Sequence, residues 1–262
     1  MSCFGCPWKR PPLKGLLAFL WGMESSAETL AESSGLTGRE LLERYGPPLA
    51  AEQVDCLLRH AALFREWNEK INLVSRKRIH LLEEEHLLHS LAVLKFYCLP
   101  PGWRVVDVGC GGGLPGLPLA IANPEVEFTL LDSIQKKVRA VADMAEQLGL
   151  ENVRTVWGRA EEQSGKYDLV MGRAVASLPT FVQQTQHFLP KKEPKTQAPS
   201  PEPGQLPTPP RGYLYLKGGD LTDELTPLQH RGWSYQLHSL AEVLPLPFYE
   251  TKLLVSLWRK PK

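Results

Sequence analysis

A cluster of glycines after a short apolar run is the stretch whose residue types point most directly to chemistry. The β-branched run at residues 105–108 predicts a buried strand. Gly109, Gly111, Gly112 and Gly113 follow it, and glycine allows positive φ and close approach of a ligand to the backbone. Pro115 or Pro118 could begin the helix that follows the turn. A strand, a glycine turn and a helix in this order form the nucleotide crevice of open α/β sheets. A glycine turn without a ligand is the alternative, because this pattern alone is a weak signal.

Two acidic residues strengthen the interpretation as a ligand site. Asp132 ends a second apolar run about 20 residues later, where an acid can accept hydrogen bonds from both hydroxyls of a ribose. Asp107 lies late in the first strand, where a buried carboxylate needs a partner. It either binds the backbone amides of the turn or helps to hold the cationic end of a ligand, and the sequence leaves both roles open.

Composition narrows the class of protein. The chain has 262 residues, a hydrophobic content of 43% and a formal net charge of +1, so any contact with nucleic acid must come from local basic patches. The five cysteines are scattered, which predicts free thiols in a reducing compartment and no disulfide framework. Neither a metal site nor a membrane span is expected, because the Cys3–Cys6 pair has no partner cluster and no apolar run is long enough.

The elements that position these residues divide the chain into three parts. Residues 1–40 are expected to be disordered or weakly structured, and whether residues 1–22 serve in targeting, or Met23 is the true start, stays open. Residues 41–100 read as a helical region, with one amphipathic helix ending near residue 73 and another over residues 79–97. The remainder, 101–262, reads as an α/β domain.

Strands and helices alternate in that domain, which implies a parallel sheet covered on both faces. We expect strands over 104–109, 126–131, 152–157, 167–172 and 213–217, and helices over 115–122, 134–148, 178–189 and 220–230. The segments 233–240 and 249–258 lack an intervening helix, so they should pair antiparallel. The proline-rich stretch 191–212 has few large apolar residues and is expected to be a disordered surface insertion.

At this point the motifs resemble those of the bacterial ribosomal small-subunit RNA guanine-N7 methyltransferases, the glucose-inhibited division protein B family. The distinctive element is Gly113-Leu114-Pro115-Gly116-Leu117-Pro118, which generic methyltransferases lack. Other matches follow in order over roughly residues 41–258: Trp67-Asn68, Asn72-Leu73, His86 with Ser90, Leu131-Asp132-Ser133, Lys137-Val138-Arg139, Gly158-Arg159-Ala160-Glu161, Arg173-Ala174, Ser177-Leu178 and Leu216-Lys217-Gly218.

The resemblance implies a class I S-adenosylmethionine-dependent methyltransferase fold. This fold is α/β and Rossmann-like, with a mostly parallel seven-stranded sheet, a C-terminal antiparallel hairpin and, in this family, an N-terminal helical extension. It also implies S-adenosyl-L-methionine as the cofactor and N7 of a guanine in a small-subunit rRNA hairpin near the decoding centre as the target. The partner would be this rRNA or the assembled small subunit, and the protein would be a cytoplasmic monomer.

Residue types and resemblance together assign the candidate cofactor site. Its members are Asp107, Gly109, Gly111, Gly113, Leu114, Asp132, Ser133, Ala160, Glu161 and Arg173. Guanine N7 carries a lone pair and no proton, so the transfer is an in-line displacement that needs no general base. Arg173 would therefore position a phosphate or the guanine, since arginine stays protonated. The family commonly has Asp where His89 stands, which leaves the role of that position open, and the proline-rich insertion is a second departure.

Basic side chains near the expected ligand edge form a candidate RNA-binding rim. They are Arg76, Lys77, Arg78, Lys136, Lys137, Arg139, Arg173 and Lys217. Loop ends at the carboxyl edge of the sheet lie where ligands bind. The alternative is that the triplet at 76–78 is a solvated loop and the cations of 136–139 are the solvated face of a helix.

Three other functions compete with this interpretation. A methyltransferase acting on another RNA, a protein or a small molecule would keep the cofactor loop and change only the substrate. A nicotinamide-dependent oxidoreductase also uses a glycine loop, but the C-terminal hairpin and Asp107 disfavour it. A non-catalytic RNA-binding protein is disfavoured by the intact glycine turn and Asp132.

Overall fold

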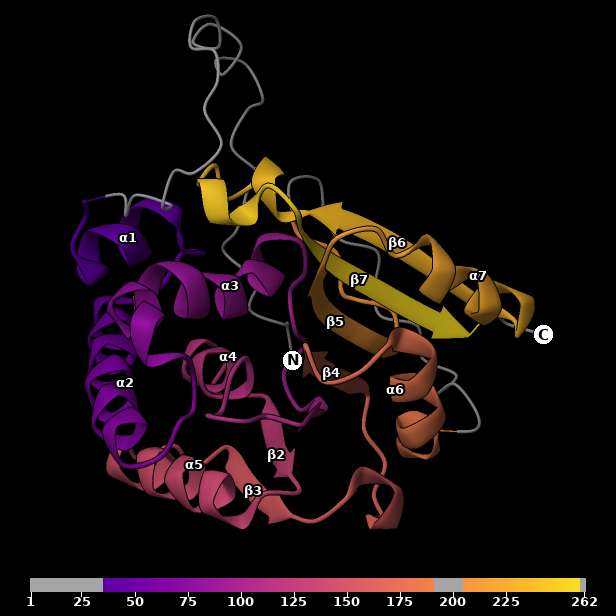
Figure 1. Cartoon of the computed structure of the whole chain (residues 1–262), viewed down its shortest axis with the longest axis horizontal. Helices are drawn as coiled ribbons and strands as arrows, with labels where there is room; N and C mark the ends of the chain where they lie inside the picture. Colours follow the sequence, from indigo (N-terminus) through magenta and orange to yellow (C-terminus); the bar gives the residue numbers. More distant parts are fainter. Residues whose placement is uncertain (1–34, 191–204, 260–262) are drawn as a thin grey trace, which may run out of the picture.

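A single mixed sheet carries the loops that form the site. The computed structural model describes residues 35–190 and 205–259, and there the strands are ordered β3-β2-β1-β4-β5-β7-β6 (Figure 1). Strands β1 to β5 pair in parallel, and β7 pairs antiparallel with both β5 and β6. Their bounds are β1 Arg104–Val108, β2 Glu127–Asp132, β3 Val153–Trp157, β4 Leu169–Arg173, β5 Gly212–Gly218, β6 Trp233–Ser239 and β7 Lys252–Arg259. The predicted parallel sheet with an antiparallel C-terminal pair is confirmed.

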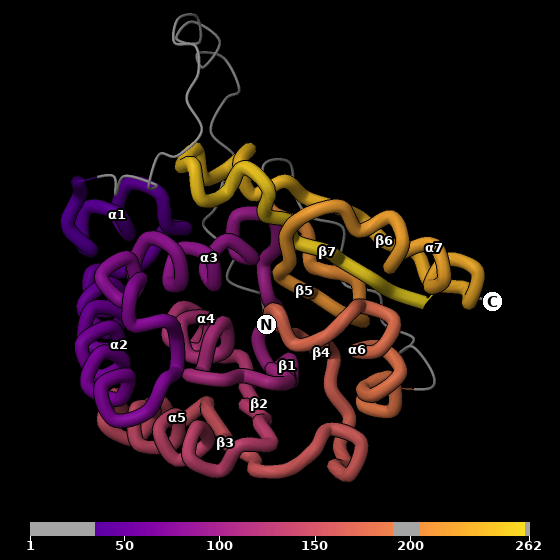
Figure 2. Tube along the Cα trace, in the orientation of Figure 1, coloured from indigo at the N-terminus to yellow at the C-terminus, as the bar shows by residue number. Residues whose placement is uncertain are grey.

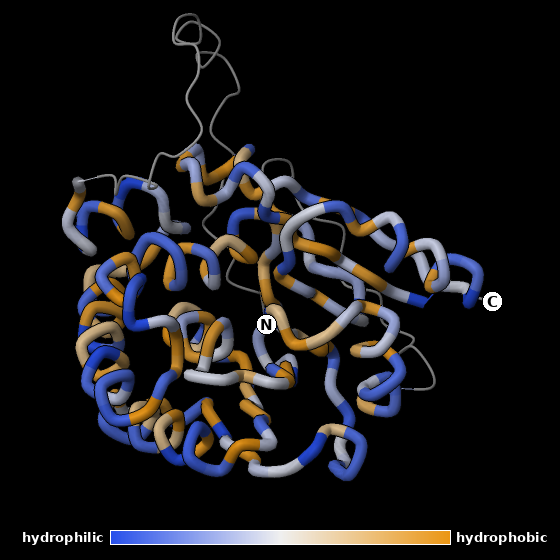
Figure 3. Tube along the Cα trace, in the orientation of Figure 1, coloured by the Kyte–Doolittle hydropathy of each residue, from blue (hydrophilic) through white to orange (hydrophobic). Residues whose placement is uncertain are grey.

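Helices cover both faces of the sheet, which explains why its central strands are apolar on both sides. Val105 and Val106, adjacent on β1, are at most 1% exposed and belong to two separate hydrophobic clusters. Helices α2, α3, α4 and α5 contribute to the first cluster, and α6 and α7 contribute to the second. Hydrophobic and hydrophilic residues alternate along the trace of α2 (Figure 3). Their bounds, with that of α1, are α1 Gly38–Tyr45, α2 Ala51–Lys70, α3 Leu88–Leu91, α4 Gly116–Ala122, α5 Gln135–Gln147, α6 Leu178–Thr185 and α7 Thr222–His230.

Helix α2 attaches the N-terminal region to the sheet domain (Figure 2). The indole N–H of Trp67 donates to Asp143 of α5 at 2.7 Å, and the Gln53 side chain donates to the carbonyls of Ile121 and Ala122 at the end of α4. Phe64 is fully buried between them. The helical region therefore shares the core of the α/β domain.

The N-terminal boundary differs from the prediction. Helix α1 begins at Gly38 with a capping box, in which Glu40 N–H donates to the Thr37 hydroxyl and Thr37 N–H donates to the Glu40 carboxylate. Residues 35–40 were predicted to be disordered or weakly structured, and that is wrong, because the capping box was not recognised in the sequence. The rest of the predicted N-terminal segment, residues 1–34, lies outside the described residues.

The single helix predicted over 79–97 is also wrong. The chain forms a 3₁₀ helix Arg76–Leu81, a π helix Leu82–Leu87, the short α3 and a 3₁₀ helix Ala92–Lys95. The hydroxyl of Tyr249, far along the chain, donates to the backbone carbonyl of Glu84 within this segment. Such a tertiary bond competes with regular helical pairing and is invisible to sequence periodicity.

The prediction of a disordered insertion over 191–212 is wrong for its last residues. Leu206 is 4% exposed, and the carbonyl of Pro207 accepts a hydrogen bond from the Cys98 N–H at 3.0 Å. Gly212 already belongs to β5. The buried leucine, this backbone bond and the ion pair of Arg211 with Asp168 anchor this end of the stretch, while residues 191–204 lie outside the described residues. None of the helices in the described ranges is long and apolar enough to cross a bilayer.

Asn152 joins the end of α4 to the start of β3, and its removal should lower stability. Its side-chain amide lies 3.0–3.1 Å from the carbonyls of Ala120, Asn123 and Val126. We expect Asn152→Ala to lower the free energy of unfolding by about 1–3 kcal/mol, because partly buried carbonyls lose their donor. Urea denaturation measures this. The exposed neighbour variant Glu151→Ala should stay within about 0.5 kcal/mol of the native protein, and equal midpoints for both variants would contradict the assignment.

Candidate active site

The turn after β1 has a backbone that favours glycine at three positions. Gly109, Gly111 and Gly113 have φ of 70°, 57° and 86°, in the left-handed region. A Cβ on Gly109 would lie 2.8 Å from a methyl of Val175, whereas a Cβ on Gly111 would meet no atom within 4 Å. The Gly109 and Cys110 N–H groups both donate to the Leu131 carbonyl of β2. The turn is thus pinned to the neighbouring strand and leaves open space at Gly111.

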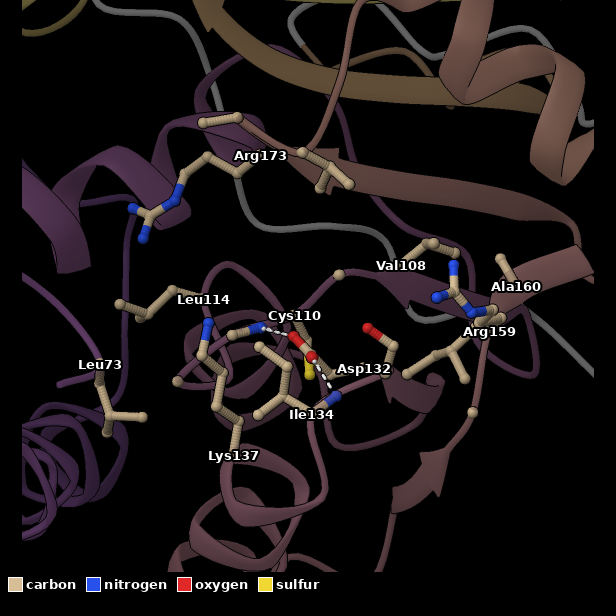
Figure 4. Close-up of a pocket in the computed structure, with 18 of the residues that line it drawn as sticks. Leu73, Val108, Cys110, Leu114, Asp132, Ile134, Lys137, Arg159, Ala160 and Arg173 are labelled. Atoms are coloured by element: carbon tan, nitrogen blue, oxygen red, sulfur yellow. Dashed lines mark hydrogen bonds between the residues drawn. The ribbon is translucent and has the colours of Figure 1, made fainter. Parts of the chain in front are cut away.

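A cavity of about 490 Å³ lies over this turn, within the usual range of roughly 300–1,000 Å³ for small-molecule sites. Its walls come from the loops after β1, β2, β3 and β4 and from one loop of the N-terminal region (Figure 4). The lining residues are Leu73, Val74, Val108, Gly109, Cys110, Gly111, Gly112, Leu114, Leu131, Asp132, Ser133, Ile134, Lys137, Gly158, Arg159, Ala160, Glu161, Arg173, Ala174, Val175 and Gln184. The cavity therefore opens at the carboxyl edge of the parallel strands, where open α/β sheets bind ligands.

Asp132 ties two walls of the cavity together. It is the last residue of β2 and is 6% exposed. One carboxylate oxygen accepts from the Gly111 N–H at 2.9 Å and the other accepts from the Ile134 N–H at 2.8 Å (Figure 4). Each oxygen has a further lone pair, so the carboxylate can still accept from two ligand hydroxyls.

Asp107 lies behind the turn and does not line the cavity. It is fully buried, and its Oδ2 accepts from the Gly116 N–H at 2.9 Å, which is the structural role foreseen for it. Its Oδ1 has no hydrogen-bond partner among the described residues. Burial raises the pKa of this carboxyl to about 7. Gly113 also faces away from the cavity, because a Cβ there would collide with Leu117.

Arg173 ends β4 and brings a half-buried positive charge to the cavity. Its Nη1 lies 3.3 Å from Nδ1 of His86, which belongs to the π-helical turn. Burial lowers the pKa of Arg173 to about 10, so the guanidinium stays charged at neutral pH. Burial and the charge of Arg173 lower the pKa of His86 to about 3, so His86 is a neutral acceptor for the arginine. The next residue, Ala174, has a φ of 54°, a strained conformation often found at functional sites.

The far end of the cavity is formed after β3 by Arg159, Ala160 and Glu161. Figure 4 places Ala160 and Arg159 opposite Leu73 and Arg173. The sequence interpretation assigned Ala160 and Glu161 to the site but gave Arg159 no role, although it belongs to the same motif. It did not assign Leu73 or Val74 to the site. The only signal for them was the Asn72-Leu73 match to the family, which contains Leu73 and precedes Val74. Nothing in the sequence pointed to Gln184 or Val175.

The candidate RNA-binding residues divide into two sets. Lys137 lines the cavity, and Arg76, Lys77, Lys136 and Arg139 are exposed. Arg78 forms two hydrogen bonds to the buried carboxylate of Glu85, and Lys217 lies 2.5–2.6 Å from the carboxylate oxygens of Glu224. The structure therefore pairs Arg78 and Lys217 with acids inside the protein and does not bring them into the rim as free cations.

His89, at the position where the resemblance implied an Asp, is buried between aromatic rings. Its ring contacts Phe248 and Tyr249 edge-on with centroid separations of 5.9 Å, and its Nε2 has no hydrogen-bond partner among the described residues. Burial holds the pKa of His89 well below its usual value. A neutral imidazole therefore packs where the family commonly places an acid. In the described part of the chain, no three His, Cys, Asp or Glu side chains gather as a metal site would require.

The sequence model of one family, rRNA small subunit methyltransferase G, matches residues 53–196. The chain belongs to this family. It is 41% identical over 223 residues to ribosomal RNA small subunit methyltransferase G of Christiangramia forsetii, which covers 85% of this chain and 98% of the relative. It is also 40% identical over 216 residues to the protein of the same name from Cytophaga hutchinsonii. That match covers 82% of this chain and 97% of the relative. The resemblance inferred from the motifs and the class I methyltransferase fold are both confirmed.

The residues of the cavity fit S-adenosyl-L-methionine, the cofactor of this methyltransferase family. Asp132 has spare lone pairs for the ribose hydroxyls, and the open space at Gly111 admits a ligand against the backbone. Asp107 lies behind the turn with one carboxylate oxygen that has no partner among the described residues, and negative charge there favours a sulfonium. These assignments define two measurements.

Asp132→Asn should weaken binding of S-adenosylhomocysteine by about 10- to 100-fold. The substitution removes the charge from hydrogen bonds worth about 1.5–3 kcal/mol each and turns an amide N–H toward the turn. Isothermal titration calorimetry measures the affinity. The control Glu127→Gln removes the same charge from the exposed start of the same strand, and its affinity should be unchanged. Equal losses in the two variants would contradict the assignment of Asp132.

Asp107 should make the preference for the sulfonium cofactor pH-dependent. With a pKa of about 7, its carboxyl is largely protonated at pH 6 and ionised at pH 8. The ratio of affinities for S-adenosylmethionine over the uncharged S-adenosylhomocysteine should therefore rise as pH rises, by up to about tenfold. Asp107→Asn keeps a side-chain oxygen that can accept from the Gly116 N–H but has no carboxyl to ionise. In this variant the affinity ratio should therefore rise less between pH 6 and pH 8. A rise of unchanged size in the variant would show that another group is responsible.

Proposed function

We propose that the protein transfers the methyl group of S-adenosyl-L-methionine to N7 of a guanine in small-subunit rRNA. The observation that carries this proposal is the meeting of family motifs at one cavity. The glycine turn, Asp132, the Ala160 loop and Arg173 come from separate parts of the chain and line the same space. Motifs from separate parts of the chain are expected to meet in this way if they serve to bind a ligand in the cavity and not only to stabilise the fold.

The chemistry asks little of the protein beyond binding and orientation. Bound S-adenosylmethionine supplies an electrophilic methyl group, and guanine N7 supplies the lone pair, so no proton has to be removed. Holding two reactants in line is worth roughly 7–11 kcal/mol. His86 is the imidazole in contact with Arg173, and its low pKa and its arginine partner suit it to positioning and not to proton transfer.

Arg173 is placed to hold the substrate. Its guanidinium lines the cavity and stays positive, and it can bind a phosphate or the carbonyl edge of a guanine. The cations Arg76, Lys77, Lys136, Lys137 and Arg139, which form no ion pair with another described residue, supply the surrounding positive field for the RNA backbone. The expectation of a cytoplasmic monomer stays a prediction, which light scattering and cell fractionation can check.

The test uses the full chain with methyl-labelled S-adenosylmethionine. Purified small ribosomal subunits, deproteinised small-subunit rRNA and bulk cellular protein are offered as separate substrates. We expect label in rRNA from the subunits or the free rRNA, and chain cleavage specific for N7-methylguanine should map it to one position. Label confined to protein or to small molecules would replace the proposed substrate.

Arg173 should matter more for turnover than for cofactor binding. We expect Arg173→Ala to lower kcat/KM for rRNA by about 100-fold, a loss typical of misplaced reactants, while the affinity for S-adenosylhomocysteine changes less. Arg173→Lys keeps the charge but loses the planar guanidinium, so its kcat/KM for rRNA should lie between those of the native protein and Arg173→Ala. Steady-state kinetics at saturating cofactor measure this, and an Arg173→Ala enzyme within twofold of the native value would rule out the positioning role.

A further inference from the structure

A second hollow adjoins the cofactor cavity. Residues 72–77 line it, and its volume is about 580 Å³. Leu73 and Val74 line both spaces, so a single backbone segment separates them. Because a methyltransferase must bring a second reactant next to its cofactor, a hollow that shares a wall with the cofactor cavity is a candidate for that reactant.

The shared wall is held firmly in place. The side-chain oxygen of Asn68, itself 2% exposed, accepts from the N–H groups of both Leu73 and Val74 at 2.9 Å. A Cβ on Gly112 would lie 3.2 Å from the Leu73 Cβ, so the leucine packs directly on the glycine turn. The wall is therefore positioned by the same turn that forms the floor of the cofactor cavity.

Polar side chains along the hollow are available to a ligand. Asn72, Ser75, Arg76 and Lys77 are exposed, and none of the described residues that line the hollow is acidic. Within the described residues, the side chains of Asn72, Ser75 and Lys77 make no hydrogen bond or ion pair, and Arg76 makes only a long bond of 3.3 Å to the Glu69 carbonyl. Two cations, an amide and a hydroxyl beside an apolar wall suit a nucleotide of an RNA strand.

The hollow meets the appropriate end of the cofactor cavity. In Figure 4, Leu73 lies on the same side as Leu114 and Arg173, opposite the end formed by Ala160. The cation that we assign to substrate positioning is thus on the side of the cavity that the hollow adjoins.

We propose that the hollow lined by residues 72–77 binds the RNA nucleotide that carries the target guanine. Its phosphate lies on Arg76 and Lys77, and its base passes over Leu73 and Val74 toward the cofactor. When N7 faces the cofactor, the opposite edge of guanine presents N–H donors, and the Asn72 carboxamide can accept from them. This inference rests on the function proposed above and adds the place where the substrate binds.

The experiment compares Lys77→Ala and Asn72→Ala with the control Arg231→Ala. Arg231 is an exposed cation that follows α7, outside both cavities, and its loss changes the net charge as Lys77→Ala does. For each full-length variant, the affinity for small-subunit rRNA is measured as a function of salt, together with kcat and KM for methyl transfer and the affinity for S-adenosylhomocysteine.

We expect Lys77→Ala to raise the KM for rRNA about 3- to 10-fold and to reduce the slope of log K against log salt by about 0.7, the value for one contact to single-stranded phosphate. Asn72→Ala should raise the KM without changing the salt slope. Both variants should keep native affinity for S-adenosylhomocysteine, and Arg231→Ala should resemble the native protein in every measurement.

The outcomes separate this inference from the proposed function. If the native protein methylates rRNA but Lys77→Ala and Asn72→Ala retain its KM and salt slope, the hollow is not the nucleotide site. If the native protein methylates neither the small subunit nor the deproteinised rRNA, the proposed function is wrong, and the nucleotide site inferred from it is wrong with it. Equal effects of Lys77→Ala and Arg231→Ala would show a general charge effect and would also overturn the assignment.

Discussion

One buried carboxylate determines the shape of the cofactor cavity. Asp132 binds the backbone of the glycine turn with one oxygen and the backbone of the next loop with the other. The two loops follow neighbouring parallel strands, so the sheet brings them close but does not fix their separation. Two short hydrogen bonds to a charged group fix it. The glycine backbone, the cavity over it and the placement of Ile134 all depend on this bridge.

Charge is distributed unevenly around this bridge. Asp107 lies behind the turn with one oxygen unpaired, while Arg173 lies at the cavity with His86 as its neutral partner. A buried guanidinium is costly unless it is hydrogen-bonded and near a counter-charge, and both conditions are met here. An acid at position 89 would add negative charge near Arg173. His89 is neutral and adds none, so more of the negative charge opposite the Arg173 guanidinium has to come from Asp107.

Sequence reasoning succeeded for the main local signals, although it missed the capping box between Thr37 and Glu40, and it failed where the cause was a tertiary contact. The strand–glycine–helix unit, Asp132 and the antiparallel end of the sheet follow from residue types within a short window. The irregular helical segment around Glu84 could not be foreseen, because the Tyr249 hydroxyl that bonds to it comes from the other end of the chain. Arg78 and Lys217 looked like free cations for another reason: their partners Glu85 and Glu224 lie only seven residues further along the chain, but no helical or strand spacing in the sequence predicted these contacts. The end of the proline-rich stretch shows that a few contacts, the burial of Leu206 and the Arg211–Asp168 ion pair among them, can place a segment whose composition indicates disorder.

The contact between Phe64 and Gly112 has a consequence for how this enzyme can be divided. A Cβ on Gly112 would lie only 2.6 Å from the phenyl ring, so α2 rests directly on the glycine turn. The helical region is thus not a detachable accessory that could be exchanged between methyltransferases to redirect their targets. A chimera that joins this sheet to a foreign N-terminal region would have to reproduce the shape of Phe64 and Leu73, or the turn would lose its backing.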